Sequence, residues 1–462
     1  MDPVSSGRVA RRVAILGAGA AGLAAAHTLR REAPETEFDV LEGLDRVGGL
    51  VETERTREGF LIEHGPDSLV THDMAGVDMA CNVGLADRFV TETSVPQRAY
   101  LASGTELLPL PPGLLAMSPR TTLGLLASPR LTPRGKARVL LEPFVPRRRE
   151  PGDESVAEFF SRRFGSELAE KLVDPLLSGI YATPTADLSM HSALPRLTAL
   201  EKRSGSVALG VTLARMKRRS RLPGVVSLRS GMGELTDALA DSVRDRIRLS
   251  AEVRSVSRGP HSTLRLEMAS GETREVDAMT VAIPAWSAAR ILRPLDRELA
   301  NSLEQIEYAP HFSMSMAWPA AQVPHPMEGT GFLVANDQHR FITACTWSSR
   351  KWPSCAPEGW VLMRVFGGDA TVAAEEAAAR VRSDLRDLMG IEKEPALVRI
   401  RRHQRLMPRR RVGHLGLVAR IEKRAAQVGR ITLAGNCLGT IGIPACIAGG
   451  VSAARRLRGD SP

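Results

Sequence analysis

Short apolar runs bounded by glycine or proline recur along the chain and predict strands that are buried on both faces. The first run, residues 13–16, leads into a glycine-rich turn and then into an alanine- and leucine-rich helix. Residues 38–42 predict the next strand, and residues 279–283 and 431–434 predict two later ones. Continuous apolar runs of this length are typical of parallel strands covered by helices. The pattern therefore predicts an α/β fold whose parallel sheet is assembled from distant parts of the chain.

A different pattern occupies the middle of the chain. Between residues 285 and 395, strands alternate with helices, as expected of a second domain with a mixed sheet. Its predicted elements are strands at 313–318, 329–334, 341–347 and 361–368 and a helix at 375–389. Residues 107–145 are rich in leucine, proline and arginine, and the prolines near their start exclude one continuous helix. Short helices with apolar faces and basic ends are therefore expected there.

The turn after the first predicted strand has the composition of a dinucleotide-binding motif. Gly17 suits the tight turn, Gly19 allows the backbone to approach a diphosphate, and Gly22 lets the helix pack closely on the sheet. The N-terminus of the helix favours the negative charge of the diphosphate. Glu42 lies 20 residues beyond Gly22, where an acidic residue accepts hydrogen bonds from an adenosine ribose. Glycines alone are weak evidence, but strand, turn, helix and acid all occur here at the expected spacing.

The residues that follow indicate which dinucleotide is bound. Arg46, Gly48 and Gly49 come just after Glu42, and residues 65–68 have the sequence GPDS. This combination resembles the FAD-binding N-terminus of the flavin amine oxidase and protoporphyrinogen oxidase superfamily. NAD dehydrogenases do not share the second glycine pair. The predicted cofactor is therefore FAD.

The resemblance extends along nearly the whole chain. LLSGIYA at 176–182, GTGF at 329–332, ITACTW with KWP and PEG at 342–359, and further motifs at 407–447 occur in order and resemble bacterial porphyrinogen oxidases. The 342–359 stretch is most similar to the coproporphyrinogen III oxidase branch. The resemblance implies that FAD takes a hydride from a methylene bridge of a porphyrinogen while a pyrrole N–H proton is lost. It also implies that molecular oxygen reoxidises the flavin to give hydrogen peroxide, with three rounds yielding the porphyrin of haem biosynthesis.

The same resemblance implies a set of FAD contacts. Val253 matches a strand whose backbone meets the adenine, although core packing would look the same in the sequence. Near the flavin ring it implies Asn436, Gly442, Ile443 and Pro444. The other implied cofactor contacts are Gly17, Gly19, Ala20, Ala21, Gly22, Glu42, Arg46, Gly48, Gly49, Gly65, Pro66, Asp67 and Ser68. No acid–base pair is visible, so the flavin itself is expected to carry the chemistry.

Several positions depart from the usual pattern of the family. His403 stands where related enzymes place a tryptophan against the flavin, so it is expected beside the flavin. Ala445 replaces the usual aspartate. Where the family usually has MPQYHVGH, this chain has arginines at 409–411, which are expected to form either a clamp for substrate carboxylates or a solvated loop. Ala99 stands where a substrate-binding arginine is common, so Arg98, one position earlier, is the candidate substrate contact. These departures put the substrate and turnover in question, but not FAD binding.

Charge and composition indicate which classes of partner the protein is expected to bind. The formal net charge is +10, but aromatic residues make up only 4% of the chain and no RNA- or DNA-binding motif occurs. An acidic substrate or an anionic membrane surface is therefore expected rather than nucleic acid. Residues 107–149 are expected to form a helical domain that packs on itself, with a surface that dips into the membrane interface as the alternative. The five cysteines have no disulfide pattern and no metal-ligand spacing, so a metal-free cytoplasmic protein is expected. No run reaches about 18 apolar residues, so at most peripheral membrane contact is expected.

Taken together, the patterns predict an α/β fold with a discontinuous Rossmann-like FAD-binding domain, a helical domain and a mixed-sheet substrate domain. The FAD-binding domain comprises residues 1–80, 229–284 and 396–462, the helical domain 81–228, and the substrate domain 285–395. Oxygen-dependent coproporphyrinogen III oxidation is the leading function. A protoporphyrinogen oxidase, a flavin oxidase recruited to a specialised metabolite, and a FAD-binding protein without turnover stay open. The oligomeric state is not predicted.

Overall fold

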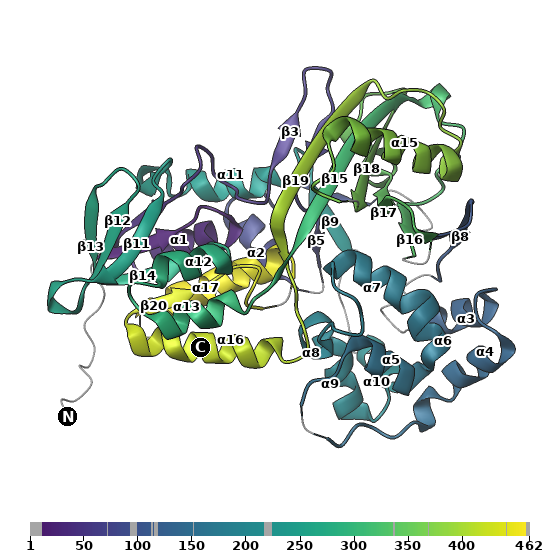
Figure 1. The fold of residues 1–462 in the computed structure, drawn as a ribbon, viewed down its shortest axis with the longest axis horizontal. Helices are drawn as coiled ribbons and strands as arrows, with labels where there is room; N and C mark the ends of the chain where they lie inside the picture. The colour runs from purple at the N-terminus through teal and green to yellow at the C-terminus, as the bar shows by residue number, and fades with distance from the viewer. Residues whose placement is uncertain are drawn as a thin grey trace.

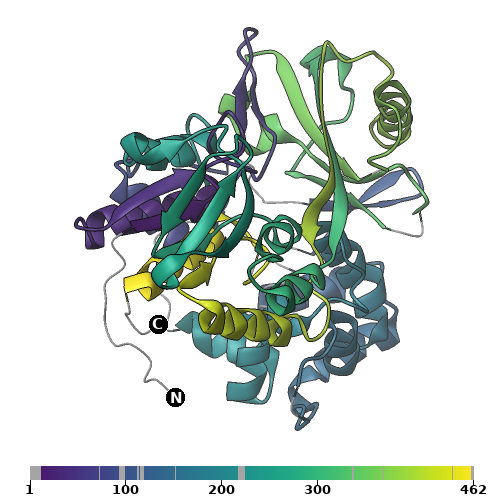
Figure 2. The same ribbon diagram turned by 60° about the vertical axis from the view of Figure 1, so that its left-hand side comes forward.

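The structure is a computed structural model that describes residues 12–71, 73–92, 99–111, 114, 119–150, 152–216, 224–335, 338–367, 369–439 and 441–458. Figures 1 and 2 show three parts: helices around a parallel sheet, a second part built on long antiparallel strands, and a lobe of short helices. In Figure 1 these parts lie to the left, at the upper right and at the lower right.

A five-stranded sheet in the order β10-β2-β1-β14-β20 forms the first part, and every neighbouring pair is parallel. Its strands are β1 (Arg12–Leu16), β2 (Glu37–Leu41), β10 (Ile247–Arg248), β14 (Ala278–Val281) and β20 (Ile431–Leu433). All four strands expected from the apolar runs lie in this sheet. The prediction of a parallel sheet assembled from distant segments is therefore confirmed.

Layers on both faces of this sheet explain why its central strand β1 is apolar at four consecutive positions, residues 13–16. One face is covered by α1 (Ala20–Glu32), α2 (Ala75–Asn82), α11 (Gly233–Asp241) and α17 (Ile443–Arg458). The other is covered by β11 (Val253–Arg258), β12 (Leu264–Met268), β13 (Thr273–Val276), α12 (Ala285–Leu292), α13 (Arg297–Glu304) and α16 (His414–Val428). Successive side chains of a strand point to opposite faces. Val13 and Ile15 accordingly enter the first core, and Ala14 and Leu16 enter the second.

The second part is a seven-stranded sheet in the order β19-β15-β18-β17-β16-β7-β8. Its strands are β7 (Ala99–Ser103), β8 (Glu106–Pro109), β15 (Tyr308–Pro319), β16 (Gly331–Val334), β17 (Ile342–Thr346), β18 (Trp360–Gly367) and β19 (Leu397–Pro408). Helix α15 (Ala374–Met389) packs on one face and shares a core with the strands. The mixed sheet and this helix were both predicted. The division of the chain into segments stays a prediction, although this sheet also takes β7 and β8 from the 81–228 segment and β19 from the last segment.

The third part consists mainly of short helices. They are α3 (Pro119–Ala127), α4 (Pro133–Leu140), α5 (Val156–Phe164), α6 (Ser166–Leu168), α7 (Asp174–Tyr181), α8 (Met190–Ala193), α9 (Pro195–Ser204) and α10 (Val207–Met216). Short helices were expected throughout residues 107–145, and that prediction was wrong at residues 107–109. These residues belong to β8, because a turn with Gly104 at φ +62° brings them back against β7. Leu107 then packs against the core of the seven-stranded sheet.

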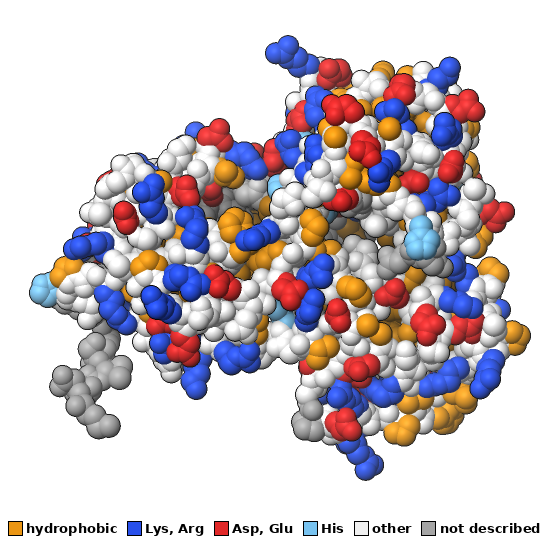
Figure 3. Space-filling model, viewed as in Figure 1, with side chains coloured by type: hydrophobic (Ala, Val, Ile, Leu, Met, Phe, Trp, Pro, Cys, Tyr) orange, Lys and Arg blue, Asp and Glu red, His pale blue; other side chains and the backbone are white. Residues whose placement is uncertain are grey.

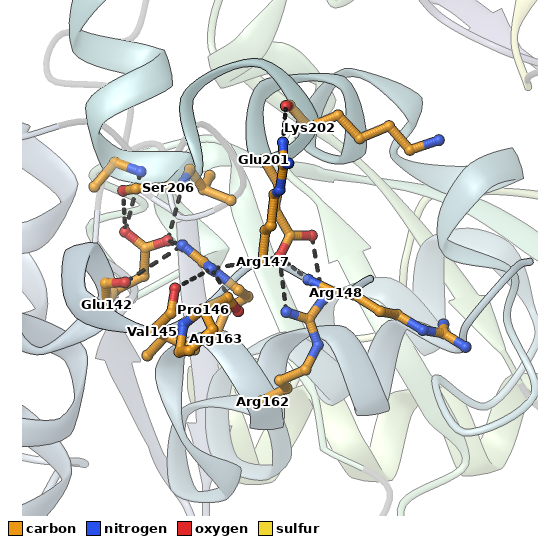
Figure 4. A network of polar contacts seen from close by, with 12 residues as sticks. Glu142, Val145, Pro146, Arg147, Arg148, Arg162, Arg163, Glu201, Lys202 and Ser206 are labelled. Carbon is orange, nitrogen blue, oxygen red and sulfur yellow. Dashed lines mark hydrogen bonds and ion pairs between the residues drawn. The ribbon is translucent and has the colours of Figure 1, made fainter. Parts of the chain in front are cut away.

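A buried ion pair lies inside the helical lobe (Figure 4). The side chains of Arg163 and Glu142 are 0% and 1% exposed and contact each other directly. Glu142 also accepts hydrogen bonds from Ser206 Oγ at 2.6 Å and from the Val207 N–H at 2.9 Å, at the start of α10. Arg163 also donates to the Val145 carbonyl at 2.8 Å. Buried charges are tolerated only when paired and hydrogen-bonded, so this network joins α5, α10 and the segment between α4 and α5.

Small elements connect the three parts. They are the hairpin β3 (Thr53–Arg55) and β4 (Leu61–Glu63), the sheet of β5 (Leu69–Val70), β9 (Val225–Leu228) and β6 (Phe89–Thr91), and the short helix α14 (Ser348–Lys351). Across the described ranges, every helix is too short or too polar to cross a membrane.

Candidate functional site

The turn between β1 and α1 has the backbone that the glycine motif predicted. Gly17 adopts φ +99°, and a Cβ there would lie 2.7 Å from the Ala282 carbonyl oxygen. A Cβ at Gly22 would lie 1.9 Å from the Gly17 carbonyl oxygen. Ala20 and Ala21 begin α1 and are buried. Gly17 and Gly22 are therefore required by the fold itself, whatever binds at the turn.

Gly19 is different, because the fold does not require a glycine there. A Cβ at Gly19 would meet only Gly48 O and Gly49 Cα, both at 3.9 Å, which is ordinary contact. Gly49 adopts φ +60°, and a Cβ on it would come within 3.1 Å of Gly19 Cα. These glycines line a space beside the first turn of α1, where unpaired backbone N–H groups favour an anion. The placement of the diphosphate here stays a prediction, and a side chain at position 19 would displace a diphosphate bound at this turn.

Glu42 lies at the end of β2, beside this turn. Its carboxylate accepts hydrogen bonds from the backbone N–H groups of Ala18 at 2.7 Å and Leu44 at 2.9 Å. Each oxygen keeps a further lone pair that can accept from a ribose hydroxyl. The backbone of Glu42 also accepts from the Ala251 N–H at 2.7 Å, which places the start of β11, with Val253, close to Glu42. The structure therefore brings the two residues assigned to the adenosine half together.

Two arginine–glutamate pairs connect the nucleotide-binding part to the seven-stranded sheet. Arg46 donates to the Gly49 carbonyl at 3.0 Å and to Glu52 at 2.8 Å, so it fixes the second glycine pair. Glu52 also accepts from Arg401 on β19 at 2.8 Å. Arg399, two residues earlier on β19, bonds Glu54 at 2.8 Å. These pairs hold one face of β19 against the hairpin β3–β4.

His403 follows on the same face of β19, since alternate residues of a strand share a face. It is exposed and forms no hydrogen bond or ion pair with any described residue. Its partner in the β15–β19 register is His311, whose pKa is lowered to about 4 by burial and by the charges of Arg364 and His403. His311 is therefore neutral at pH 7. The placement of His403 beside the flavin stays a prediction, and an uncommitted imidazole next to the Arg399 and Arg401 contacts agrees with it.

Arg364 on β18 was not identified from the sequence. It is 8% exposed, donates to the carbonyls of His64 at 2.9 Å and of Gly65, and lies with its guanidinium 4.7 Å from the centre of the Phe366 ring. Burial lowers the pKa of Arg364. A Cβ on Gly65 would lie 1.7 Å from the Leu50 carbonyl oxygen, so only glycine fits there. An arginine inside the apolar run 361–367 was the signal that a buried charge is used.

Asp67 in the GPDS segment contacts the KWP stretch. Its carboxylate accepts from Lys351 Nζ at 2.9 Å, from Trp352 Nε1 at 3.2 Å and from Ser68 Oγ at 2.8 Å. Burial alone would raise the pKa of Asp67, but Lys351 outweighs it and holds the pKa at about 2. The carboxylate of Asp67 is thus committed to Lys351, and its predicted FAD contact, like those of Ser68 and the exposed Pro66, stays a prediction.

Glu63, just before this segment, was also missed by the sequence analysis. It accepts from the Met232 N–H at 2.7 Å and from Thr53 Oγ1 at 2.8 Å. Burial raises the pKa of Glu63 to about 7. It therefore joins β3, β4 and the segment before α11.

The loop between β20 and α17 carries the residues assigned to the flavin ring. Asn436 lies in this loop, Gly442 adopts φ +112°, and Ile443 and Pro444 begin α17. Arg410 donates to the backbone carbonyls of Asn436 and Gly439, the latter at 3.0 Å.

Of the three consecutive arginines at 409–411, Arg410 is buried at 1% exposure, so the solvated-loop interpretation is wrong for it. Its neighbour Arg411 is half-exposed and bonds Glu307 at 3.0 Å. Ala99 begins β7, and Ala445 lies in the first turn of α17. The candidate substrate contact Arg98 lies outside the described residues.

Comparison with known proteins identifies the family. The sequence model of the flavin containing amine oxidoreductases matches residues 20–458. The chain belongs to this family. The coproporphyrinogen III oxidase of Bacillus subtilis is 28% identical over 96% of this chain and 97% of its own length. That of Propionibacterium freudenreichii is 30% identical over 94% of this chain and 88% of its own length.

Solved structures agree with this membership of the flavin containing amine oxidoreductases. A crystal structure from Exiguobacterium sp. 255-15, provisionally assigned as a protoporphyrinogen oxidase, covers 98% of this chain and 99% of its own with a TM-score of 0.85 and 30% identity. Cyclohexylamine oxidase from Brevibacterium oxydans is similar in fold, with a TM-score of 0.67 over 97% of this chain and 99% of its own at 16% identity. The protein is therefore a flavin-dependent oxidoreductase with the fold of this family. The space beside Gly19, the N-terminus of α1 and the carboxylate of Glu42 fit such a cofactor.

Proposed function

We propose that the protein uses FAD and molecular oxygen to oxidise coproporphyrinogen III to coproporphyrin III in haem biosynthesis, with release of hydrogen peroxide. The observation that carries this proposal is the full-length similarity to relatives named coproporphyrinogen III oxidase, which are 28–30% identical over 94–97% of the chain. Relatives named protoporphyrinogen oxidase, such as the mitochondrial enzyme of Nicotiana tabacum, are 27% identical over 96% of the chain. They make protoporphyrinogen IX the second candidate substrate.

The residues of the site support this chemistry by binding and positioning. Gly19, Gly48 and Gly49 would hold the diphosphate, Glu42 the ribose, and the loop before α17 the flavin ring. Bound FAD would supply the hydride acceptor for a methylene bridge of the substrate. His403 presents an uncommitted imidazole that can accept the pyrrole N–H proton at a ring nitrogen.

Substrate choice follows from charge. Coproporphyrinogen III carries four carboxylates and protoporphyrinogen IX two, so a basic pocket favours the former through charge-assisted hydrogen bonds. Arg98 stays a candidate for such a contact. The second group of candidates is residues 409–411, of which Arg410 is buried and Arg411 is half-exposed.

The test is a direct comparison of the two substrates. Each porphyrinogen is prepared anaerobically, mixed with FAD-loaded protein and exposed to oxygen, and porphyrin fluorescence is followed together with peroxide release. Coproporphyrinogen III should be oxidised faster. Arg98→Ala should raise KM for this substrate with little change in kcat if Arg98 binds a carboxylate equally in the ground and transition states. Equal rates on both substrates would contradict the branch assignment. Rates no higher than without protein would refute porphyrinogen oxidation and favour a recruited flavin oxidase or a protein without turnover.

We further propose a cytoplasmic location with peripheral membrane contact through the helical lobe. The observation that supports it is a group of exposed apolar side chains near α4, with Phe144 81%, Leu141 53% and Leu140 52% exposed. Figure 3 shows hydrophobic side chains together with Lys and Arg along the lower edge of this lobe. Apolar groups surrounded by basic ones are typical of surfaces that bind anionic lipids.

A further inference from the structure

The side chain of Arg410 carries a positive charge that no acidic residue of the described chain balances. Within the described ranges, its Nε and Nη2 groups bond only backbone carbonyls, those of Gly439 and Asn436. Its Nη1 group is buried and has no hydrogen-bond partner among the described residues. An unpaired charge in the interior is costly, and arginine does not lose its proton in proteins. A buried cation with a free donor therefore lies directly behind the loop between β20 and α17.

The ionisable groups around Arg410 are neutral at pH 7. Burial lowers the pKa of Arg410, and the groups that oppose this effect are two phenols and two thiols, those of Tyr181, Cys437, Cys446 and Tyr308. Burial raises the pKa of each of them, for Cys446 to about 11. His414 is close by as well, and burial and the charge of Arg410 lower its pKa to about 4. None of these groups supplies a compensating charge.

Helix α17 adds positive potential at the same place. It has 16 residues and begins at Ile443, at the end of the loop that Arg410 holds. The N-terminus of a helix carries about half a positive charge, and no acidic residue lies in the first turn of α17. Two departures from the family pattern contribute to this arrangement. Arg410 stands where the usual motif has tyrosine, and Ala445 where it has aspartate, so both changes make the loop more positive.

We propose that Arg410 and the N-terminus of α17 form a positive site that stabilises negative charge on the flavin ring. This inference rests on the proposed function, which places the flavin against this loop. Fixed charge of this kind acts strongly because it is buried and preorganised. The bound flavin of this protein is then easier to reduce than it would be with a neutral residue at position 410. Sulfite, which adds reversibly to oxidised flavin and leaves a negative charge on the ring, binds more tightly for the same reason.

The experiment separates the charge of Arg410 from its hydrogen bonds. The wild-type protein, Arg410→Met, Arg410→Lys and the control Arg411→Met are loaded with FAD. Arg411→Met removes the positive charge of the neighbouring residue, whose side chain is half-exposed. For each protein, sulfite affinity is measured by the loss of flavin absorbance, and the two-electron reduction potential by equilibration with a reference dye. Lysine keeps the charge but cannot bond both carbonyls as the planar guanidinium does.

We expect Arg410→Met to weaken sulfite binding at least about tenfold, as removal of a buried unit charge near the ring requires. The same factor in the reduction equilibrium is a fall of about 30 mV for a two-electron couple. Arg410→Lys and Arg411→Met should each stay within about threefold of wild type. If Arg410→Lys falls as far as Arg410→Met, the residue acts by holding the loop, and the proposal is overturned. Unchanged values in all three variants overturn it too.

Flavin content distinguishes this proposal from the function on which it rests. If the wild-type protein neither carries nor takes up FAD, the proposed function fails. If only the variants at position 410 lose FAD, Arg410→Tyr, which restores the usual residue of the motif, is measured as a second neutral variant. Weaker sulfite binding by Arg410→Tyr with full FAD content supports the proposal. Loss of FAD in every variant at position 410, with folding intact by circular dichroism, assigns Arg410 to cofactor retention and overturns the electrostatic role.

Discussion

Replacement of Gly19 by valine separates what the fold requires from what the cofactor requires. Gly19 has φ −78° and ψ 179°, which valine adopts without strain. A Cβ there comes no closer than 3.9 Å to Gly48 or Gly49. The loss of glycine as N-cap of α1 should cost only about 1 kcal/mol of stability. The two methyl groups of valine, however, extend into the space assigned to the diphosphate.

The expected loss of FAD affinity follows from the contacts that this displacement removes. Hydrogen bonds from backbone N–H groups to a charged diphosphate contribute about 1.5–3 kcal/mol each. Loss of two of them costs about 3–6 kcal/mol, which weakens the Kd of FAD by roughly 10² to 10⁴-fold. The Gly19→Val protein should therefore be purified without its yellow colour and should melt close to the temperature of the wild-type protein from which FAD has been removed.

The assay compares flavin content, the Kd of FAD by fluorescence quenching, and the melting temperature of the FAD-free proteins. Gly416→Val, at an exposed position of α16, is the control and should retain FAD. Gly22→Ala is the converse case, because its Cβ would lie 1.9 Å from the Gly17 carbonyl oxygen, and it should lose both stability and FAD. Stoichiometric flavin with wild-type affinity in Gly19→Val would show that the diphosphate is not bound at this turn. An equal loss of stability in Gly19→Val and Gly22→Ala would refute the distinction between the two glycines.

Three further predictions concern the ion pairs and the exposed surface. Glu142→Ala leaves the charge of Arg163 buried and largely unpaired, so the free energy of unfolding of the helical lobe should fall by about 3–5 kcal/mol in denaturant titrations. Glu142→Leu combined with Arg163→Met should recover most of this loss. A loss below about 1 kcal/mol for Glu142→Ala would contradict the prediction. Asp67 has a pKa of about 2 in the folded protein, below its unfolded value, so its ion pair stabilises the fold above about pH 4 and this stabilisation is lost as the pH falls towards 2. Lys351→Met should accordingly move acid unfolding to higher pH, whereas replacement of an exposed lysine should not. The protein should sediment with anionic liposomes at low salt, and high salt should release it. Phe144→Ser should weaken this binding. Binding independent of salt would exclude electrostatic attraction.

Local sequence determined the nucleotide-binding turn and the strands around it. Gly17 and Gly22 are dictated by contacts within the β1–α1 unit and with the next strand of the sheet, and apolar runs of four or five residues are sufficient to specify strands covered on both faces. Local sequence also specifies the start of α5, because Ser155 and Glu158, three residues apart, form a capping box there. Apart from the contact between Gly17 and Ala282, the interactions that fix these structures lie within a few residues or follow a strict period.

The tertiary structure decided which charges are buried and what they contact. Arg364 bonds the carbonyls of His64 and Gly65 from about 300 positions away, and Lys351 meets Asp67 over a similar separation. Nothing local distinguishes Arg410 from Arg411, yet one is enclosed behind the loop before α17 and the other is half-exposed beside Glu307.

Residues 107–109 show that tertiary contacts also decide the conformation of the backbone. Their composition suggested a helix, and they form a strand because β7 is present to pair with them. Propensity and periodicity are properties of a short segment, whereas burial, pairing and the pKa of a side chain depend on the elements that the fold brings around it.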